Sequence, residues 1–260
     1  MQKNKIKSVI KKKGVKPIIC LTAYSRTTAE ILDKYCDIIL VGDSVSMTLY
    51  GMKTTRDISI QTMINHGRTV KKFAKRSLVV FDMPYNSYKN KNAAYKNAKK
   101  VLKLTKCDAI KLEGGTKIVN TIKHLVKKGI PVMGHIGLLP QHSRGFKLRG
   151  KNLLQKKEIM DDAIALSKSG VFAIVIECVV ESLAKEITAK IKVPSIGIGA
   201  SKHCDGQILV IDDIIGLSNF YPKFVKRYFN VKLNIERAVK KYSEDVRKGI
   251  FPSSKHVYKI

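Results

Sequence analysis

The sequence predicts an α/β protein built as a (β/α)8 barrel of the TIM type. Eight short apolar runs recur along the 260 residues, and amphipathic stretches lie between most of them. The length suits one such barrel. A doubly wound open sheet is the alternative that this pattern leaves open. No linker rich in Pro, Gly or Ser divides the chain, so a single domain spanning residues 1–260 is expected.

The eight apolar runs are expected to be the strands. They are continuous rather than alternating with polar residues, which is typical of parallel strands that are buried on both faces. In chain order the runs occupy residues 17–24, 37–44, 77–84, 108–115, 131–138, 172–179, 194–201 and 206–213.

The stretches between the runs are expected to be the helices. Several end in Gly or Lys, as helix C-termini do. A helix at about 3–12 precedes the first strand and is expected to close the bottom of the barrel, and another at about 233–248 comes near the end of the chain. The last ten residues look irregular. The clearest amphipathic stretches between strands are 27–35, 95–106, 117–129 and 157–170.

The formal charge of +30 raises the question of nucleic-acid binding. The lysines, however, recur on nearly every expected helix, and no zinc-finger, RNA-recognition or KH signature is present. We interpret them as solvated helix faces and expect no specific nucleic-acid partner, although weak nonspecific binding of polyanions would follow. Examples are Lys71, Lys72, Lys75, Lys96, Lys99, Lys100, Lys127 and Lys128.

Targeting signals are not evident in the sequence. No apolar run reaches the roughly 18 residues that a membrane span needs. The basic N-terminal segment is not followed by an apolar core, so no secretory signal is expected. The five cysteines are scattered and form no CxxC pair, which favours reduced thiols and a cytoplasmic location. They are Cys20, Cys36, Cys107, Cys178 and Cys204.

Charged side chains stand at the ends of successive apolar runs. In a barrel these ends converge on the active site, so Asp43, Asp82 and Glu113 are expected to meet. Three carboxylates without paired His or Cys describe a hard-oxygen site, and Mg²⁺ is its natural occupant. The alternative for each acid is that it caps the helix that follows.

Three further residues in the expected strands carry chemistry. Glu177 follows Ala-Ile-Val-Ile directly, and a buried acid requires either an ion pair or a catalytic role. Lys111 shares a strand face with Glu113, so it either forms a salt bridge there or provides a cation for a substrate carboxylate. His135 is either a polar residue at the barrel mouth or a hydrogen-bond donor to substrate or transition state.

The segment Gly-Ile-Gly-Ala-Ser at 197–201 contains two glycines at the end of an expected strand. It lacks the GxGxxG spacing of a dinucleotide loop and the Lys-Ser/Thr of a phosphate loop. Close approach of another segment to the backbone at the barrel rim is the better interpretation.

Eight segments occur in a characteristic order: VGDS, FDMP, IKLEGG, VMGHIGLLPQ, VIECV, IGIGAS, CDGQILVIDDIIGL and PKFVKRY. With this ordered set, the chain resembles the ketopantoate hydroxymethyltransferase family over residues 17–252. The resemblance implies a barrel of the phosphoenolpyruvate mutase/isocitrate lyase group, one Mg²⁺ per subunit and a homo-oligomer, typically a decamer. It also implies transfer of a hydroxymethyl group from 5,10-methylenetetrahydrofolate to 2-oxoisovalerate through a Mg²⁺-stabilised enolate.

The resemblance also implies roles for individual residues. Asp43 and Asp82 would bind the metal, with Glu113 in the metal shell. Ser44 and Lys111 would contact the 2-oxo acid, beside the metal ligands. Asp43 and Asp82 are expected to bind the substrate as well, and Glu177 would be the catalytic base. A substrate contact is also expected of His135, from its place in the strand rather than from the resemblance. The resemblance assigns no residue to the folate.

The chain departs from the family pattern at several positions. After Gln141 it reads HSRGFKLRG, where the family has a longer loop of Ser-Val-Asn type. Ser46 replaces a usual Gly, and Met52 a usual His. These changes bear on loop closure, folate contact and rate. Another Mg²⁺-dependent 2-oxo-acid lyase or ligase of the same barrel group is the competing enzyme hypothesis, but such lyases tend to use a cysteine-bearing loop, and here that loop has His142, Ser143 and Arg144.

Overall fold

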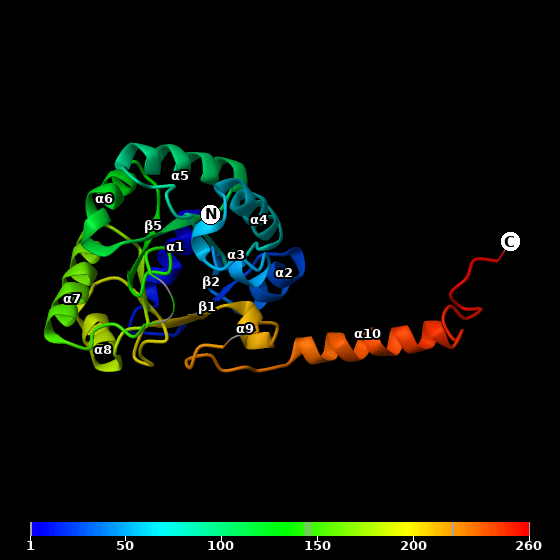
Figure 1. The fold of residues 1–260 in the computed structure, drawn as a ribbon. Coiled ribbons are helices and arrows are strands. Elements are labelled where there is room, and N and C mark those ends of the chain that lie inside the picture. The colour runs from blue at the N-terminus through cyan, green and yellow to red at the C-terminus, as the bar shows by residue number, and fades with distance from the viewer. Residues whose placement is uncertain (1, 144, 146, 220, 260) are drawn as a thin grey trace.

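Eight parallel strands close into a barrel in chain order, from β1 beside β2 round to β8 beside β1 (Figure 1). The structure is a computed structural model that describes residues 2–143, 145, 147–219 and 221–259, so Arg144 lies outside the described residues. The barrel prediction is confirmed, and closure excludes the open sheet. The strands are β1 (Ile18–Thr22), β2 (Ile38–Val41), β3 (Leu78–Asp82), β4 (Ala109–Glu113), β5 (Val132–Gly137), β6 (Ala173–Glu177), β7 (Ser195–Ile198) and β8 (Gly206–Leu209).

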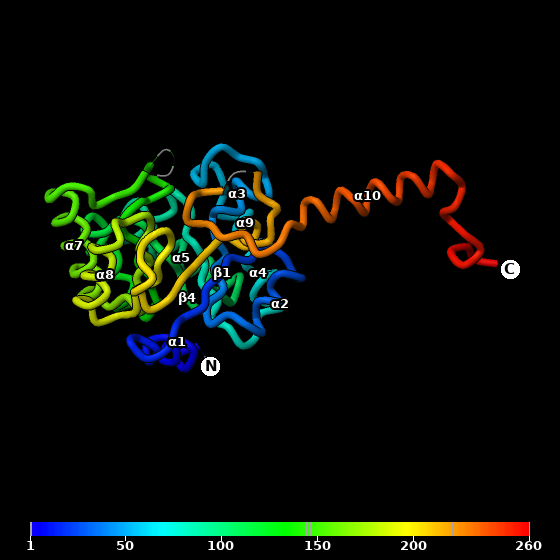
Figure 2. The backbone as a smooth tube through the Cα atoms, turned by 90° about the horizontal axis from the view of Figure 1, so that it is seen from below, coloured from blue at the N-terminus to red at the C-terminus, as the bar shows by residue number. Residues whose placement is uncertain are grey.

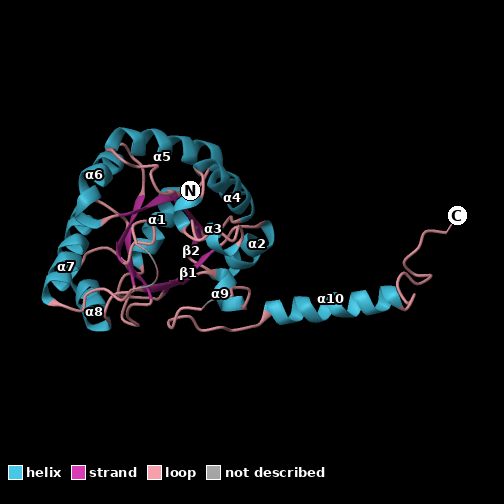
Figure 3. Cartoon of the chain, viewed as in Figure 1, coloured by secondary structure: helices cyan, strands magenta, loops and turns pink. Residues whose placement is uncertain are grey.

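Helices surround the strands on the outside (Figure 3). Every residue of β2, β3, β4 and β6 is buried, because side chains point alternately into the barrel and under the helices. The surrounding helices are α2 (Arg26–Tyr35), α3 (Val45–Thr48), α4 (Ile60–Phe73), α5 (Lys91–Thr105), α6 (Val119–Lys127), α7 (Leu153–Lys168), α8 (Glu181–Lys190) and α9 (Ile211–Ile215), with the short 3₁₀ turns η1 (Thr55–Asp57) and η2 (Gly115–Ile118).

The apolar run at 206–213 is shorter as a strand than predicted. β8 ends at Leu209 and the chain turns at once into α9. Asp212 and Asp213 occupy the first turn of this helix, where acidic side chains interact favourably with the positive end of the helix dipole. The apolar residues of this run therefore belong to two elements.

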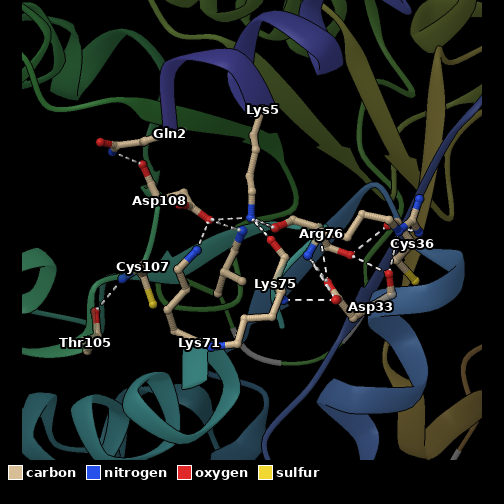
Figure 4. A network of polar contacts seen from close by, with 12 residues as sticks. Gln2, Lys5, Asp33, Cys36, Lys71, Lys75, Arg76, Thr105, Cys107 and Asp108 are labelled. Carbon is tan, nitrogen blue, oxygen red and sulfur yellow. Dashed lines mark hydrogen bonds and ion pairs between the residues drawn. The ribbon is translucent and has the colours of Figure 1, made fainter. Parts of the chain in front are cut away.

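The predicted N-terminal helix is α1 (Gln2–Lys11), and it closes the barrel floor (Figure 2). Val9 packs against apolar residues of the barrel interior. Lys5 donates to the carbonyl oxygen of Ser77 at 2.9 Å, and Lys71 pairs with Asp108 at 2.6 Å (Figure 4). Lys71 was expected on a solvated helix face; instead only 17% of its side chain is exposed, because Asp108 draws its ammonium group into the floor.

The C-terminal helix α10 (Val231–Arg247) matches the predicted helix and extends away from the barrel (Figures 1 and 2). It contains no buried residue. Its exposed apolar side chains Ile235, Val239, Tyr242 and Val246 recur at helical spacing and so form one stripe. β1 and β8 each contain one exposed residue, and in β1 it is Ile19, which is 51% exposed.

The cysteines and the helices bear on the expected reduced thiols and on the expected lack of a membrane span. All five cysteines are free and buried. None of the helices within the described part of the chain is long and apolar enough to cross a membrane.

Candidate active site

The predicted site residues gather at the mouth of the barrel, opposite α1. Parallel strands bring all their C-terminal ends to one side, and strand register sets the neighbours. Asp82 lies opposite Lys111, Glu113 opposite His135, and Gly137 opposite Glu177. The charged residues of the predicted set each leave 6% or less of their surface exposed; they are Asp43, Asp82, Lys111, Glu113, His135 and Glu177.

Lys111 is held mainly by Asp82. Its Nζ lies 2.8 and 2.9 Å from the two Asp82 carboxylate oxygens and 4.0 Å from Oε1 of Glu113. The salt bridge considered from the sequence is therefore present, but its closer partner is on the neighbouring strand. Burial alone would lower the pKa of Lys111, but the charges of Asp82 and Glu113 raise it, so the side chain stays cationic.

Asp43 lies beside Asp82, with its backbone N–H 3.4 Å from Oδ2 of that residue. Burial, and then the negative charges of Asp82 and Glu113, raise the pKa of Asp43 well above its usual range. The three acids predicted to meet are thus electrostatically coupled.

None of the three acids caps a helix. Helix α5 is capped by Asn90, while neither α3 nor η2 begins with a side-chain cap. The capping alternative is therefore wrong, and the acids are available for another role.

Gln141 is a site residue that the sequence analysis missed. Its side-chain amide donates to Asp43 Oδ2 at 2.8 Å and to the carbonyl of Met83 at 2.9 Å, and its backbone N–H donates to Glu113 at 3.1 Å. Tyr88 donates its hydroxyl to Oε1 of Gln141 at 2.5 Å. The one sequence signal was a polar residue ending the apolar Leu-Leu-Pro segment. Gln141 joins two of the acids into one network.

His135 lies between two carboxylates. Its Nδ1 is 3.4 Å from Glu113 and its Nε2 is 3.2 Å from Glu177. Burial alone would lower the pKa of His135, but the negative charge of Glu113 beside the ring raises it to about 9. At neutral pH the ring is therefore cationic and connects the acid cluster to Glu177.

Ser44 begins the short helix α3 at the rim of this cluster. Its hydroxyl lies 2.7 Å from the hydroxyl of Tyr24, which is buried. Tyr24 therefore orients Ser44 beside Asp43.

The donor set suits Mg²⁺. Mg²⁺ commonly binds proteins through one or two carboxylates and completes its shell with water and substrate, and Asp43 and Asp82 are two such carboxylates in a crowded buried cluster. As the described side chains stand, no three His, Cys, Asp or Glu residues converge on one point to hold a metal ion. Lys111 and Gln141 occupy oxygens of these acids instead.

Comparison with known proteins decides the family. The family model for ketopantoate hydroxymethyltransferase matches residues 3–254. The chain belongs to the ketopantoate hydroxymethyltransferase family. Among curated relatives, the 3-methyl-2-oxobutanoate hydroxymethyltransferase of Pelagibacter ubique (strain HTCC1062) is 52% identical, covering 98% of this chain and 99% of that protein. The protein of the same name from Anaplasma marginale (strain Florida) is 50% identical over 95% of this chain and 90% of its own.

Solved structures resemble the chain in fold. A phosphonopyruvate hydrolase in complex with oxalate and Mg²⁺ superposes with a TM-score of 0.65 at 12% identity, covering 98% of this chain and 93% of that one. A 2,3-dimethylmalate lyase, a member of the PEP mutase/isocitrate lyase superfamily, gives 0.64 at 11% identity over 99% and 92%. The likeness is one of fold, and it agrees with the (β/α)8 barrel found in the ketopantoate hydroxymethyltransferase chain.

Ser46, which departs from the family pattern, is fully buried, and its hydroxyl has no hydrogen-bond partner among the described residues. An unsatisfied buried hydroxyl destabilises the folded state. We expect Ser46→Ala to raise the free energy of unfolding by about 1 kcal/mol, as measured by urea denaturation. Ser87→Ala is the matched control, because it removes a buried hydroxyl that donates to the Pro84 carbonyl; it should destabilise. A loss of stability in Ser46→Ala would contradict the conclusion that the buried Ser46 hydroxyl is unsatisfied.

Proposed function

We propose that the protein makes ketopantoate by transferring a hydroxymethyl group from 5,10-methylenetetrahydrofolate to 2-oxoisovalerate. Membership of the family supports this reaction. The observation that carries the proposal is the position of Glu177, a buried carboxylate at the barrel mouth that stands across His135 from the Asp43, Asp82, Glu113 and Lys111 cluster. A carboxylate base beside a polar cluster that contains a lysine cation suits removal of a proton from the carbon next to a carbonyl group.

One Mg²⁺ per subunit is part of the proposal. Asp43 and Asp82 would hold it, with Glu113 beside them, and when bound it would supply Lewis acidity toward the 2-oxo acid. The crowding of these acids in a buried site supports a divalent cation there, since it would offset their mutual repulsion.

The side chains of the protein supply the remaining chemistry. Lys111 and Ser44 bind the oxygens of the 2-oxo acid, and Lys111 stabilises the negative charge that develops as the proton leaves. Glu177 takes the proton from C3 of the substrate. The cationic ring of His135 holds Glu177 in position through their 3.2 Å contact. Burial of the cluster keeps bulk water from C3 while C3 forms its bond to the methylene carbon of the folate. A water molecule then supplies the oxygen of the hydroxymethyl group as the bonds from that carbon to the folate nitrogens break, and tetrahydrofolate leaves.

Product formation tests the proposal. Purified protein would be incubated with 2-oxoisovalerate, 5,10-methylenetetrahydrofolate and Mg²⁺, with and without EDTA, and analysed by mass spectrometry. We expect ketopantoate only without EDTA. C3 deuterium exchange without product would keep the proton-removal step and reject the folate acceptor. Folded protein that shows neither would reject the proposed function.

We also propose that the protein works as a homo-oligomer, a decamer as is typical of its relatives, in the cytoplasm. The apolar stripe of α10 supports association, because none of its residues is buried within the chain. The exposed Ile19 on β1 is a surface that the described helices of the same chain leave uncovered. The free buried cysteines are compatible with a reducing compartment.

Size-exclusion chromatography followed by light scattering measures the mass of the oligomer. We expect Val239→Asp with Val246→Asp to dissociate the oligomer, because the substitutions place charges in the apolar stripe. Arg237→Asp, on the opposite face of the same helix, should leave the mass unchanged. An unchanged mass in the double variant would exclude the stripe from the interface.

A further inference from the structure

A second cavity lies beside the C-terminal ends of β6 and β7 and against Gln207, near the start of β8. Its volume is about 850 Å³, and its lining includes Cys178, Gly199, Lys202, Gln207 and Lys223. Four of these five residues belong to the segments VIECV, IGIGAS, CDGQILV and PKFVKRY, and Lys202 lies between IGIGAS and CDGQILV. Apart from Glu177, these four segments contribute none of the residues assigned above to metal or 2-oxo acid.

The cavity adjoins the proposed base. Glu177 is opposite Ile198 in the β6–β7 register. Cys178 and Gly199, which both line the cavity, are the next residues along these two strands. The cavity therefore reaches to within one residue of Glu177 along the chain, on the side of β6 away from β4 and the Lys111–Asp82 pair.

One wall of the cavity is built by close packing. Gly199 has φ +57°, and a Cβ atom there would lie 2.5 Å from the ring of Phe224. The Phe224 ring thus packs directly against the backbone of Gly199, which confirms the close approach predicted for residues 197–201. Gln207 donates to the carbonyl of Ser201 at 2.8 Å and fixes the same segment. The result is an aromatic surface held in a defined position.

The charge of the cavity distinguishes it from the other large cavity at the mouth. Lys202 and Lys223 line it, both exposed at the rim, and no described acid does so. The other cavity, of about 670 Å³, carries three basic residues but also four acids, which are Glu113, Glu158, Asp161 and Asp162. An anionic aromatic molecule is therefore favoured in the first cavity and opposed in the second.

We infer that this cavity binds the one-carbon carrier. An aromatic ring of the carrier lies against Phe224, and Lys202 and Lys223 bind the carboxylates of its glutamate tail. The inference rests on the proposed function, since the reaction requires a carrier whose methylene group lies next to the 2-oxo acid. A tetrahydrofolate combines aromatic rings with a dianionic tail, which is the chemistry that this lining recognises.

Binding and kinetics test the inference together. The probe is 5-formyltetrahydrofolate, titrated calorimetrically into the full-length protein. We expect Lys202→Glu with Lys223→Glu to weaken its binding about tenfold or more, since two attractive contacts become repulsive. The Michaelis constant for methylenetetrahydrofolate should rise by a similar factor. The matched control is Lys190→Glu with Lys192→Glu, which makes the same charge change on exposed residues just before β7, at the floor end of the barrel.

Deuterium exchange at C3 of 2-oxoisovalerate, measured without folate, separates this inference from the proposed function. Both double variants should exchange at the wild-type rate, because neither lysine pair contacts the 2-oxo acid site. Equal folate binding in the two double variants would overturn the inference while leaving the proposed function in place. Wild-type protein that binds no 5-formyltetrahydrofolate, yet exchanges C3 protons, would overturn both the carrier site and the folate reaction.

Discussion

Replacing Glu177 with Gln is expected to slow C3 proton exchange of 2-oxoisovalerate by about two to four orders of magnitude, the range that a positioned general base contributes. The amide keeps the size of the side chain and cannot accept the proton. Exchange into deuterium oxide, followed by proton NMR in the presence of Mg²⁺, measures this step without the folate.

Binding of the 2-oxo acid should persist in Glu177→Gln, because Lys111 and Ser44 are untouched. Glu186→Gln, an exposed position on α8, is the control and should exchange normally. Normal exchange in Glu177→Gln would remove this residue from the role of base and would direct attention to another group at the mouth.

Replacing Asp82 with Ala is expected to have two separable effects. The concentration of Mg²⁺ required for half-maximal activity should rise by about tenfold or more, because one of the two proposed carboxylate ligands is lost. The free energy of unfolding without metal should fall by about 3–5 kcal/mol, because the buried ammonium of Lys111 loses its closest partner and keeps only Glu113, 4.0 Å away. A Mg²⁺ titration and a urea denaturation measure the two effects.

A second substitution distinguishes the two effects. Lys111→Met in the Asp82→Ala background removes the buried charge that has lost its closest partner. It should restore much of the stability, but not the affinity for Mg²⁺. An unchanged metal titration in Asp82→Ala would show that this acid serves only as the partner of Lys111.

The sequence predicts the barrel well because each buried parallel strand is visible as an apolar run, and because strand ends must converge. It places Asp43, Asp82 and Glu113 at one mouth for the same reason. It does not show that Lys111 bonds to Asp82, since that contact depends on the register between β3 and β4. Nor does it reveal Gln141, whose loop folds back over the mouth to reach Asp43 across 98 positions.

The end of β8 shows a second limit of sequence patterns. Apolarity alone continues through Ile211, whereas the chain changes from strand to helix at Val210. The acids at 212 and 213 indicate the start of a helix, but this signal is weak compared with the apolar pattern. The sequence also does not show that the Lys71 side chain points into the barrel floor. Its partner Asp108 is distant in the sequence, and a lysine on a helix is usually solvated.

The floor formed by α1 and by the Lys71–Asp108 pair lies at the opposite end of the barrel from the acids that we assign to chemistry. Asp108 also accepts from the backbone N–H of Val79 and so fastens β3 from below. Resistance to heat and rate of turnover therefore depend on residues at opposite ends of the barrel. Changes at the floor should alter how long the protein survives at a given temperature, while each surviving molecule works at its original speed.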